Sequence, residues 1–344
     1  MTQATGDDLL GSFLADPHNA ALDMTTAVER CTHALGLQQS LVCLPLLDGA
    51  ERLGVVAVRA PALDAVLLRR ARALASLLAM MVTSKRHYKD SFVRRTRTDT
   101  MQLPTELLRA FLPPRTIGTP DVVSTAVLEP AYEIAGDGFD HALTGTTLHA
   151  SILDSMGHDL TSGLATSVTL AACRNARRVG ADLPQLVEDV DAALARWLPD
   201  QFCTGVLAQL DVSSGLLRWS NCGHPAPLLI RVQALVPHAM EKEADPPMGF
   251  PSTLVPGPRQ VHRIALEPGD PVLMYTDGAT ESRMRNGTEF GLERFVDYVV
   301  RAAASGELAP ETLRRLIHSL LESETTGLRD DATILMFEWK RPQR

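Results

Sequence analysis

Three aspartates of this chain stand at the ends of short apolar runs that predict buried strands. Asp154 and Asp277 each directly follow such a run, and Asp330 directly precedes one. A carboxylate at the end of a buried strand is held by a rigid element while its side chain projects into a cleft. These positions are typical of metal ligands.

Asp137 has a different context, between Gly136 and Gly138, where the missing side chains let the backbone pass close to another segment. Four carboxylates gathered in one cleft would repel each other strongly. Mn²⁺ or Mg²⁺, hard cations that prefer oxygen ligands, would relieve that repulsion. Each acid taken alone also has a plainer interpretation, because Asp-Gly is a common turn dipeptide and Asp before a strand is often a cap or loop residue. Spacing alone does not bring the four acids together.

The overall composition is that of an ordinary globular protein. The 344 residues predict two domains, or one large domain with an appendage. The net charge is -8, with 41 acidic against 33 basic residues. This balance argues against non-specific nucleic-acid binding, which needs a basic surface, and it leaves carboxylates available for cations.

The location predicted from the sequence is cytoplasmic. Residues 1–11 show no basic region followed by an apolar core, so no signal peptide is expected. The most apolar helical run, residues 74–82, is too short to cross a bilayer. The five cysteines lack CxxC spacing, which favours reduced and mostly buried thiols.

The first part of the chain predicts a small α/β domain over residues 1–88. A helix is expected at Ala21 to Leu35, followed by strands at Ser40 to Leu47 and Arg52 to Val58. Asp48-Gly49 between the strands is a hairpin signal.

A helical pattern then runs from Ala62 to about Val93, and we assign residues 89–115 to a helical linker. The basic segment 85–97 is interpreted as the solvated end of the helix that starts at Ala62. A short helix is expected at Glu106 to Leu112, where the two prolines that follow stop it. The expected apolar face of the long helix consists of Leu63, Val66, Leu67, Leu74, Leu77, Leu78 and Met81.

Strands dominate the domain that we place at residues 116–344. Helices are grouped between runs of consecutive strands, which favours a layered α+β fold in which two central sheets are flanked by helices, an α-β-β-α sandwich. The expected strands are 122–128, 148–153, 205–210, 216–219, 227–230, 271–275 and 332–338. The expected helices are 160–178, 183–197, 292–304 and 310–321.

Five motifs in this domain occur in the order of a known family. Together they resemble PPM-type (type 2C) metal-dependent protein serine/threonine phosphatases, in the bacterial branch related to sporulation and stress-response, sigma-factor-regulating phosphatases. They are EIAGDGFD at 133–140, DSMGHD at 154–159, NCGHP at 221–225, YTDGATE at 275–281 and RDDAT at 329–333.

The resemblance implies a two-metal site. Asp154 would bridge the metals, the Ser155 carbonyl would bind one of them, Asp277 and Asp330 would hold one metal, and Asp137 would support the other directly or through water. Asp331, the neighbour of a ligand, ranks second as a candidate, and Gly278 stands beside Asp277.

Three departures from the family pattern stand out. Ala135 replaces a second glycine, Gly138-Phe139 replaces bulkier aromatics, and the second motif ends in His158-Asp159 where His-Gly is usual. Asp159 could add a ligand, but we favour it as the N-cap of the next helix. None of these departures removes a predicted ligand.

Two histidines and one asparagine are further site candidates. His158 and His224 invite a general-acid role because His titrates near neutrality. His224, in the Asn221-containing loop before Pro225, is interpreted as structural or substrate-facing in preference to a metal ligand.

The implied reaction is hydrolysis of phosphoserine or phosphothreonine by a water that two metals activate for in-line attack. Neither Cys-x5-Arg nor a phosphate-cradling P-loop is present. The resemblance also implies a substrate, a phosphorylated STAS-type anti-sigma-factor antagonist. Two alternatives are a catalytically silent regulator that binds a phosphoprotein, and a small-molecule phosphate hydrolase.

The N-terminal region resembles the latter part of a GAF sensor domain, chiefly over residues 45–58. It is short for a complete GAF domain, and a dimerisation or packing module is an equal alternative. The apolar face of the helix predicts either homodimerisation through this region or packing on the N-terminal domain.

Overall fold

The computed structural model describes residues 40–48, 51–60, 64–85, 100–129, 136–157, 159–250, 257–281, 291–304, 309–323 and 331–340. The chain divides into two compact units, residues 1–98 and 99–344, which are described separately. The predicted helix at Ala21 to Leu35, and the candidate residues His158 and Asp330, lie outside the described residues.

The first unit contains the predicted hairpin. Strands β1 (Ser40–Asp48) and β2 (Glu51–Ala60) pair antiparallel, with Asp48 opposite Glu51. Helix α4 (Ala65–Lys85) packs on the hairpin and completes a small core with Val42 and Leu44. The resemblance of this region to a GAF domain stays a prediction.

The predicted apolar face of α4 is wrong in part. The helix buries Ala71, Ala75 and Ala79, whereas Leu74 and Leu77 are exposed. Residues four apart lie on one face of a helix, and the small alanine side chains let α4 approach the hairpin closely. The leucines therefore lie away from the core of this unit.

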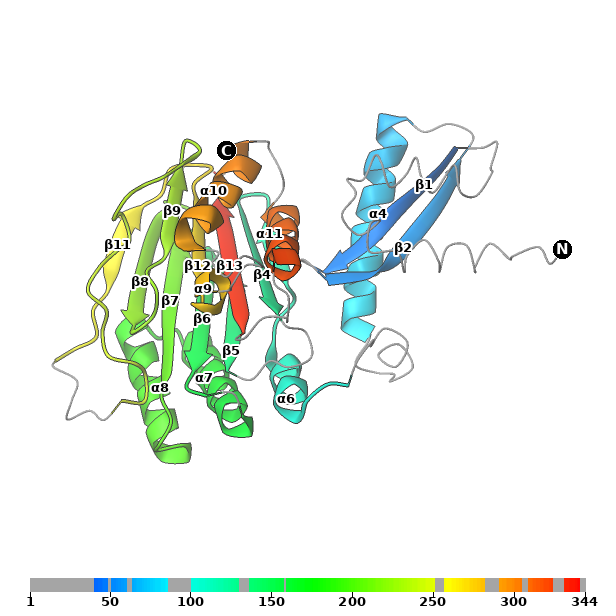
Figure 1. Ribbon diagram of the computed structural model, residues 1–344. Helices are drawn as coiled ribbons and strands as arrows, with labels where there is room; N and C mark the ends of the chain where they lie inside the picture. The colour runs from blue at the N-terminus through cyan, green and yellow to red at the C-terminus, as the bar shows by residue number, and fades with distance from the viewer. Residues whose placement is uncertain are drawn as a thin grey trace. The chain divides into compact units, whose positions relative to one another are not determined.

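The second unit is a sandwich of two antiparallel sheets (Figure 1). The six-stranded sheet has the order β10-β9-β12-β13-β4-β3, and the five-stranded sheet has the order β11-β8-β7-β6-β5. The strands are β3 (Thr116–Thr119), β4 (Val122–Glu129), β5 (Asp137–Thr144), β6 (Thr147–Ser155), β7 (Cys203–Asp211), β8 (Leu216–Cys222), β9 (Leu228–Arg231), β10 (Ala234–Leu235), β11 (His262–Ala265), β12 (Pro271–Tyr275) and β13 (Ala332–Trp339).

Helices cover both outer faces of the sandwich. Helices α7 (Leu160–Arg178) and α8 (Leu183–Trp197) pack on the five-stranded sheet through a core that includes Leu153 and Leu207. On the other side α11 (Ala309–Ser323) packs on the six-stranded sheet beside α10 (Gly291–Ala304), after the short helix α9 (Gly278–Glu281).

The main core lies between the two sheets. Phe139, Ile152 and Trp219 from the five-stranded sheet pack with Leu128 and Phe337 from the six-stranded sheet. Their strands alternate between this core and a helix-covered face, because successive side chains of a strand point to opposite sides. The predicted layered fold, α-β-β-α, is confirmed.

Helix α6 (Leu103–Phe111) lies within the second unit, inside the stretch that the sequence assigns to a linker. Its Leu108 is completely buried in the core of this unit. The carbonyl of Phe111 accepts a hydrogen bond from the Arg174 guanidinium on α7. Helix α6 is therefore held both by the core of the sandwich and by α7.

Among the described residues, no helix is long and apolar enough to span a bilayer.

Candidate metal centre

Asp137 and Asp154 face each other across two neighbouring strands. Asp137 begins β5, Asp154 stands next to the end of β6, and the two residues are direct partners in the antiparallel register. Side chains of directly opposed residues lie on the same face of a sheet, with Cβ atoms about 5 Å apart. The sequence placed Asp137 in a Gly-flanked segment and not in a strand, so this pairing was not predicted.

The carboxylate of Asp137 is held by two hydroxyls from the other sheet. Its Oδ2 accepts hydrogen bonds from Thr276 Oγ1 and Thr333 Oγ1, both at 2.7 Å. The Asp137 residue is 3% exposed. Burial, followed by the negative charges of Asp154 and Asp331, raises the pKa of Asp137 well above 3.8, although the two hydroxyls oppose this shift. A nearby cation would remove this electrostatic penalty.

Asp331 supports the backbone that carries Asp137. Its Oδ2 accepts the N–H groups of Gly136 and Asp137, at 3.1 and 3.3 Å. A carboxylate used this way fixes the start of β5. Its sequence neighbour Asp330, the predicted ligand, lies outside the described residues, so its role stays a prediction.

Asp277 lies two residues after the end of β12, and its neighbour Gly278 approaches Asp331 closely. Asp277 is exposed, and its carbonyl accepts the N–H groups of Thr280 and Glu281 at 2.8 Å, so it starts the single turn of α9. A Cβ added to Gly278 would overlap the carbonyl oxygen of Asp331. The Asp-Gly dipeptide is therefore pressed against the residue that supports Asp137.

Gly136 makes a second close approach, to the segment that contains Ser155. An added Cβ would lie 2.6 Å from the carbonyl oxygen of Ser155, 3.0 Å from that of Gly157 and 3.6 Å from Asp154 Oδ1. The Ser155 N–H also donates to the Gly136 carbonyl, and the Thr166 hydroxyl contacts both Gly136 O and Ser155 Oγ. This close approach was expected from the flanking glycines.

The donors gathered here fit a hard divalent cation. They are carboxylate and main-chain carbonyl oxygens, which Mg²⁺ and Mn²⁺ prefer. No three His, Cys, Asp or Glu side chains among the described residues are arranged as a complete metal-binding set.

Both ring nitrogens of His224 have hydrogen-bond partners within the fold. Its Nε2 lies 3.1 Å from the Tyr275 carbonyl and its Nδ1 lies 3.0 Å from Thr204 Oγ1. Burial lowers the pKa of His224 to about 4, although the hydrogen bond to Tyr275 raises it. The ring is neutral at pH 7 and uses both nitrogens. Asn221 holds the His224 backbone through two hydrogen bonds of 2.8 and 2.9 Å.

Asp159 caps α7. Its Oδ1 accepts the N–H groups of Thr161 and Ser162 at 2.8 and 3.1 Å. This is the N-cap role that the sequence analysis favoured.

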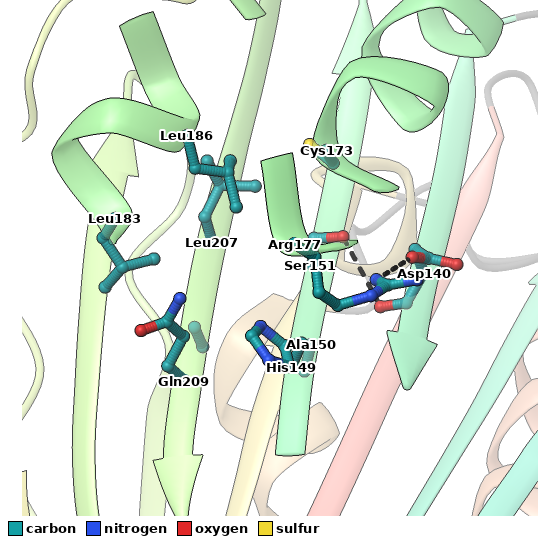
Figure 2. A pocket seen from close by; sticks show the side chains of 11 residues that line it. Asp140, His149, Ala150, Ser151, Cys173, Arg177, Leu183, Leu186, Leu207 and Gln209 are labelled. Carbon is teal, nitrogen blue, oxygen red and sulfur yellow. Dashed lines mark hydrogen bonds and ion pairs between the residues drawn. The ribbon is translucent and has the colours of Figure 1, made fainter. Parts of the chain in front are cut away.

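Further along α7, two arginines clamp β5. Arg174 and Arg177 both form ion pairs with the buried carboxylate of Asp140, at 2.7 and 2.6 Å. Asp140, Arg177 and His149 line a small cavity (Figure 2). Its volume of about 20 Å³ is room for one water molecule. Asp140 follows Asp137 by three residues on β5, so the clamp helps to hold this strand against α7.

The sequence model of the Stage II sporulation protein E (SpoIIE) family matches residues 144–340, which is more than half of the chain. The chain belongs to the SpoIIE family. It therefore carries a SpoIIE/PP2C-type phosphatase domain, as its motifs predicted.

Several solved structures have a similar fold. The SpoIIE-family chain is 22% identical to the PP2C domain of SiaA from Pseudomonas aeruginosa, with a TM-score of 0.57, over 69% of this chain and 94% of that one. It is 23% identical to the RsbU and RsbW domains of Rv1364c from Mycobacterium tuberculosis, with a TM-score of 0.54, over 67% of this chain and 63% of that one.

A third structure contains the PP2C phosphatase domain and a regulatory-domain fragment of SpoIIE from Bacillus subtilis. Identity is 16% and the TM-score 0.53, over 64% of each chain. The SpoIIE-family chain thus spans less than two thirds of the Mycobacterium and Bacillus chains. At these identities the likeness shows the fold.

Sequence reasoning missed the hydroxyls of this SpoIIE-family site. Thr276 and Thr333 bind Asp137, Thr166 binds the Gly136 carbonyl, and Thr204 binds His224. A signal was present at two of them, because Thr276 directly precedes Asp277 and Thr333 follows Asp331 by two residues on a strand end.

Proposed function

We propose that the chain is a protein serine/threonine phosphatase that hydrolyses phosphoserine and phosphothreonine at the Asp137–Asp154 cluster. The observation that carries this proposal is the convergence of Asp137, Asp154, Asp331 and the Asp277-Gly278 turn at the acid-bearing ends of both sheets. Family membership supports the same activity.

Asp154, Asp277, Asp330 and the Ser155 carbonyl would hold two divalent cations, Mn²⁺ or Mg²⁺, with Asp137 directly or through water. Two cations bound together lower the pKa of a water and offset charge on phosphoryl oxygens. The chain's own contribution is positional. Thr276 and Thr333 orient the Asp137 carboxylate, and Asp331 fixes the backbone beneath it.

No cysteine nucleophile is needed, and the described cysteines are unsuited to that role. Cys173, Cys203 and Cys222 are buried and free, and burial raises the pKa of Cys203 and of Cys222 to about 12. A thiol at pH 7 in these positions stays protonated.

A protein substrate is favoured by the surface next to the acids. Met156, Leu160 and Leu164 are 46%, 41% and 38% exposed, and they begin directly after Ser155. Leu160 and Leu164 are four residues apart on α7 and share a face. Exposed apolar surface beside a site is typical of contact with another protein. A small phosphate ester would leave this surface uncovered.

We further propose that the substrate is a phosphorylated STAS-type anti-sigma-factor antagonist, in the cytoplasm, because the motifs resemble those of the sigma-factor-regulating branch. Homodimerisation through the N-terminal domain and α4 also stays a proposal. The exposed Leu77 and Met81 of α4 would supply apolar contact area for it.

The direct test is dephosphorylation of a phosphorylated STAS protein with Mn²⁺ and with excess EDTA. We expect phosphate release with Mn²⁺ and none with EDTA. A chain that binds the phosphoprotein but releases no phosphate under any divalent cation would instead be a silent regulator. Equal or better turnover of small phosphate esters would favour the small-molecule hydrolase.

A further inference from the structure

The side chain of His224 connects the two sheets at the ends that carry the acids. Its Nε2 lies 3.1 Å from the carbonyl of Tyr275, on the six-stranded sheet. Its Nδ1 lies 3.0 Å from the hydroxyl of Thr204, on the five-stranded sheet. Because a carbonyl only accepts, Nε2 carries the proton and Nδ1 accepts from Thr204. The His224 residue is 6% exposed.

Each end of this link leads to a predicted metal ligand. Thr204 is the direct partner of Asp154 in the β6–β7 register, and this pairing connects the two residues. The Thr204 hydroxyl also lies 3.4 Å from the Asp154 carbonyl oxygen, but its one proton goes to His224 Nδ1. Tyr275 stands two residues before Asp277. Thr276, between them, donates to Asp137. A change in the separation of Thr204 and Tyr275 would therefore move the acids relative to each other.

The loop that carries His224 is itself fixed. The Asn221 side chain donates to the His224 carbonyl and accepts from its N–H, which closes the loop at the end of β8. Gly223 between them has φ +72, a conformation that favours glycine. An added Cβ there would also lie 3.1 Å from Pro247 Cγ. The imidazole is thus presented in one position.

We propose that His224 is a positioning residue that sets the separation between Asp154 on one sheet and Asp277 beyond the other, and through it the affinity for the divalent cations. This inference rests on the proposed function. Both ring nitrogens are already hydrogen-bonded, so His224 acts through Thr204 and Tyr275 and does not itself bind a metal. Residues that orient metal ligands typically change metal affinity by about 10- to 100-fold when they are replaced.

The test is calorimetric titration of Mn²⁺ into the metal-free full chain, for the wild type, His224→Phe and Thr204→Val. Phe keeps an aromatic ring at position 224 but removes the hydrogen bonds to Thr204 and Tyr275. Val removes only the hydroxyl of Thr204. We expect the Kd for Mn²⁺ to rise by about tenfold or more in His224→Phe and by less in Thr204→Val. The Mn²⁺ concentration for half-maximal p-nitrophenyl phosphate hydrolysis should rise in parallel, with a smaller change in kcat at saturating Mn²⁺.

The matched control is a cross-sheet hydrogen bond at the far end of the sandwich. Trp339 Nε1, at the end of β13, donates to the carbonyl of Val212, just after β7, at 2.8 Å. Trp339→Phe should lower the melting temperature and leave the Mn²⁺ Kd unchanged. Unchanged Mn²⁺ affinity in His224→Phe, with a wild type that binds Mn²⁺, would overturn this inference alone. A wild type that binds no Mn²⁺ would overturn both this inference and the proposed function.

Discussion

Asp137 and Asp154 are direct partners in the β5–β6 register, and their carboxylates lie on one face of the sheet at the end where Thr276 and Thr333 arrive from the other sheet. This arrangement places two carboxyl groups side by side, and that of Asp137 is buried. Burial and the neighbouring acids raise the pKa of Asp137. Without a cation, this cluster of acids therefore lowers the stability of the folded protein.

Asp137→Asn should stabilise the protein in EDTA and weaken its response to Mn²⁺. The pKa of Asp137 is higher in the folded state than its ordinary value of 3.8, so protonation of Asp137 favours the folded state. This contribution to stability is fully present below pH 3.8 and is lost as pH rises through the pKa of the folded state. At pH 8 we expect a gain of about 1 kcal/mol, a few degrees in Tm, for the variant in EDTA. Differential scanning calorimetry measures it, and a lower Tm than wild type in EDTA would contradict the argument.

Asp154→Asn and Asp277→Asn should each abolish divalent-dependent hydrolysis while leaving the fold intact. Each change removes one charged oxygen ligand from the predicted site. A phosphoprotein assay with Mn²⁺, together with circular dichroism, measures the two effects. Asp211→Asn is the control, because Asp211 ends β7 at the end away from Thr204, where its carboxylate accepts hydrogen bonds from Ser213 and Ser214. Full activity of either site variant would count against the assignment.

Gly278→Ala should be destabilising, because its Cβ would overlap the carbonyl oxygen of Asp331, a backbone atom that cannot rotate away. We expect a loss of about 2 kcal/mol in the free energy of unfolding, with reduced Mn²⁺ affinity. Urea unfolding measures the first and calorimetry the second. The control is Gly54→Ala on β2, where the nearest atom to an added Cβ is Leu46 Cδ1 at 3.7 Å. Equal stability of the two variants would show that the Gly278 contact is unimportant.

Leu164→Ser should change substrate preference. If the exposed face of Leu160 and Leu164 contacts a protein substrate, the ratio of kcat/KM for phosphoprotein to that for p-nitrophenyl phosphate should fall by about tenfold. Val179→Ser, just beyond the other end of α7 and 74% exposed, is the matched control and should leave the ratio unchanged. A ratio unaffected by Leu164→Ser would remove the argument from this surface for a protein substrate.

The strands and helices with clear hydrophobic periodicity were predictable from the sequence, and β5 was not. Residues 137–144 contain turn formers and polar side chains, a composition that argues against a strand. They form one because Phe139 packs between the sheets while Asp140, on the other face, meets Arg174 and Arg177. Those partners are distant in sequence, so local pattern does not reveal them.

The sequence named the acids of the candidate site, but it did not show which groups each of them contacts. Asp331 ranked second as a ligand, which stays a prediction, and in the structure its carboxylate accepts the N–H groups of Gly136 and Asp137, a contact that the sequence did not indicate. The role of His224 as a link between sheets also depends on Thr204 and Tyr275, which only the fold brings to it. Side-chain identity therefore indicates which groups can act, and tertiary contacts decide which of them position the others.

The measurement that tests the two-metal centre most directly is an anomalous difference map from crystals of the chain grown with Mn²⁺. We predict two manganese peaks a few ångströms apart, with Asp154 between them and Asp277 and Asp330 on one of them. A map with no manganese at Asp154, from crystals whose protein hydrolyses phosphoserine, would contradict the account.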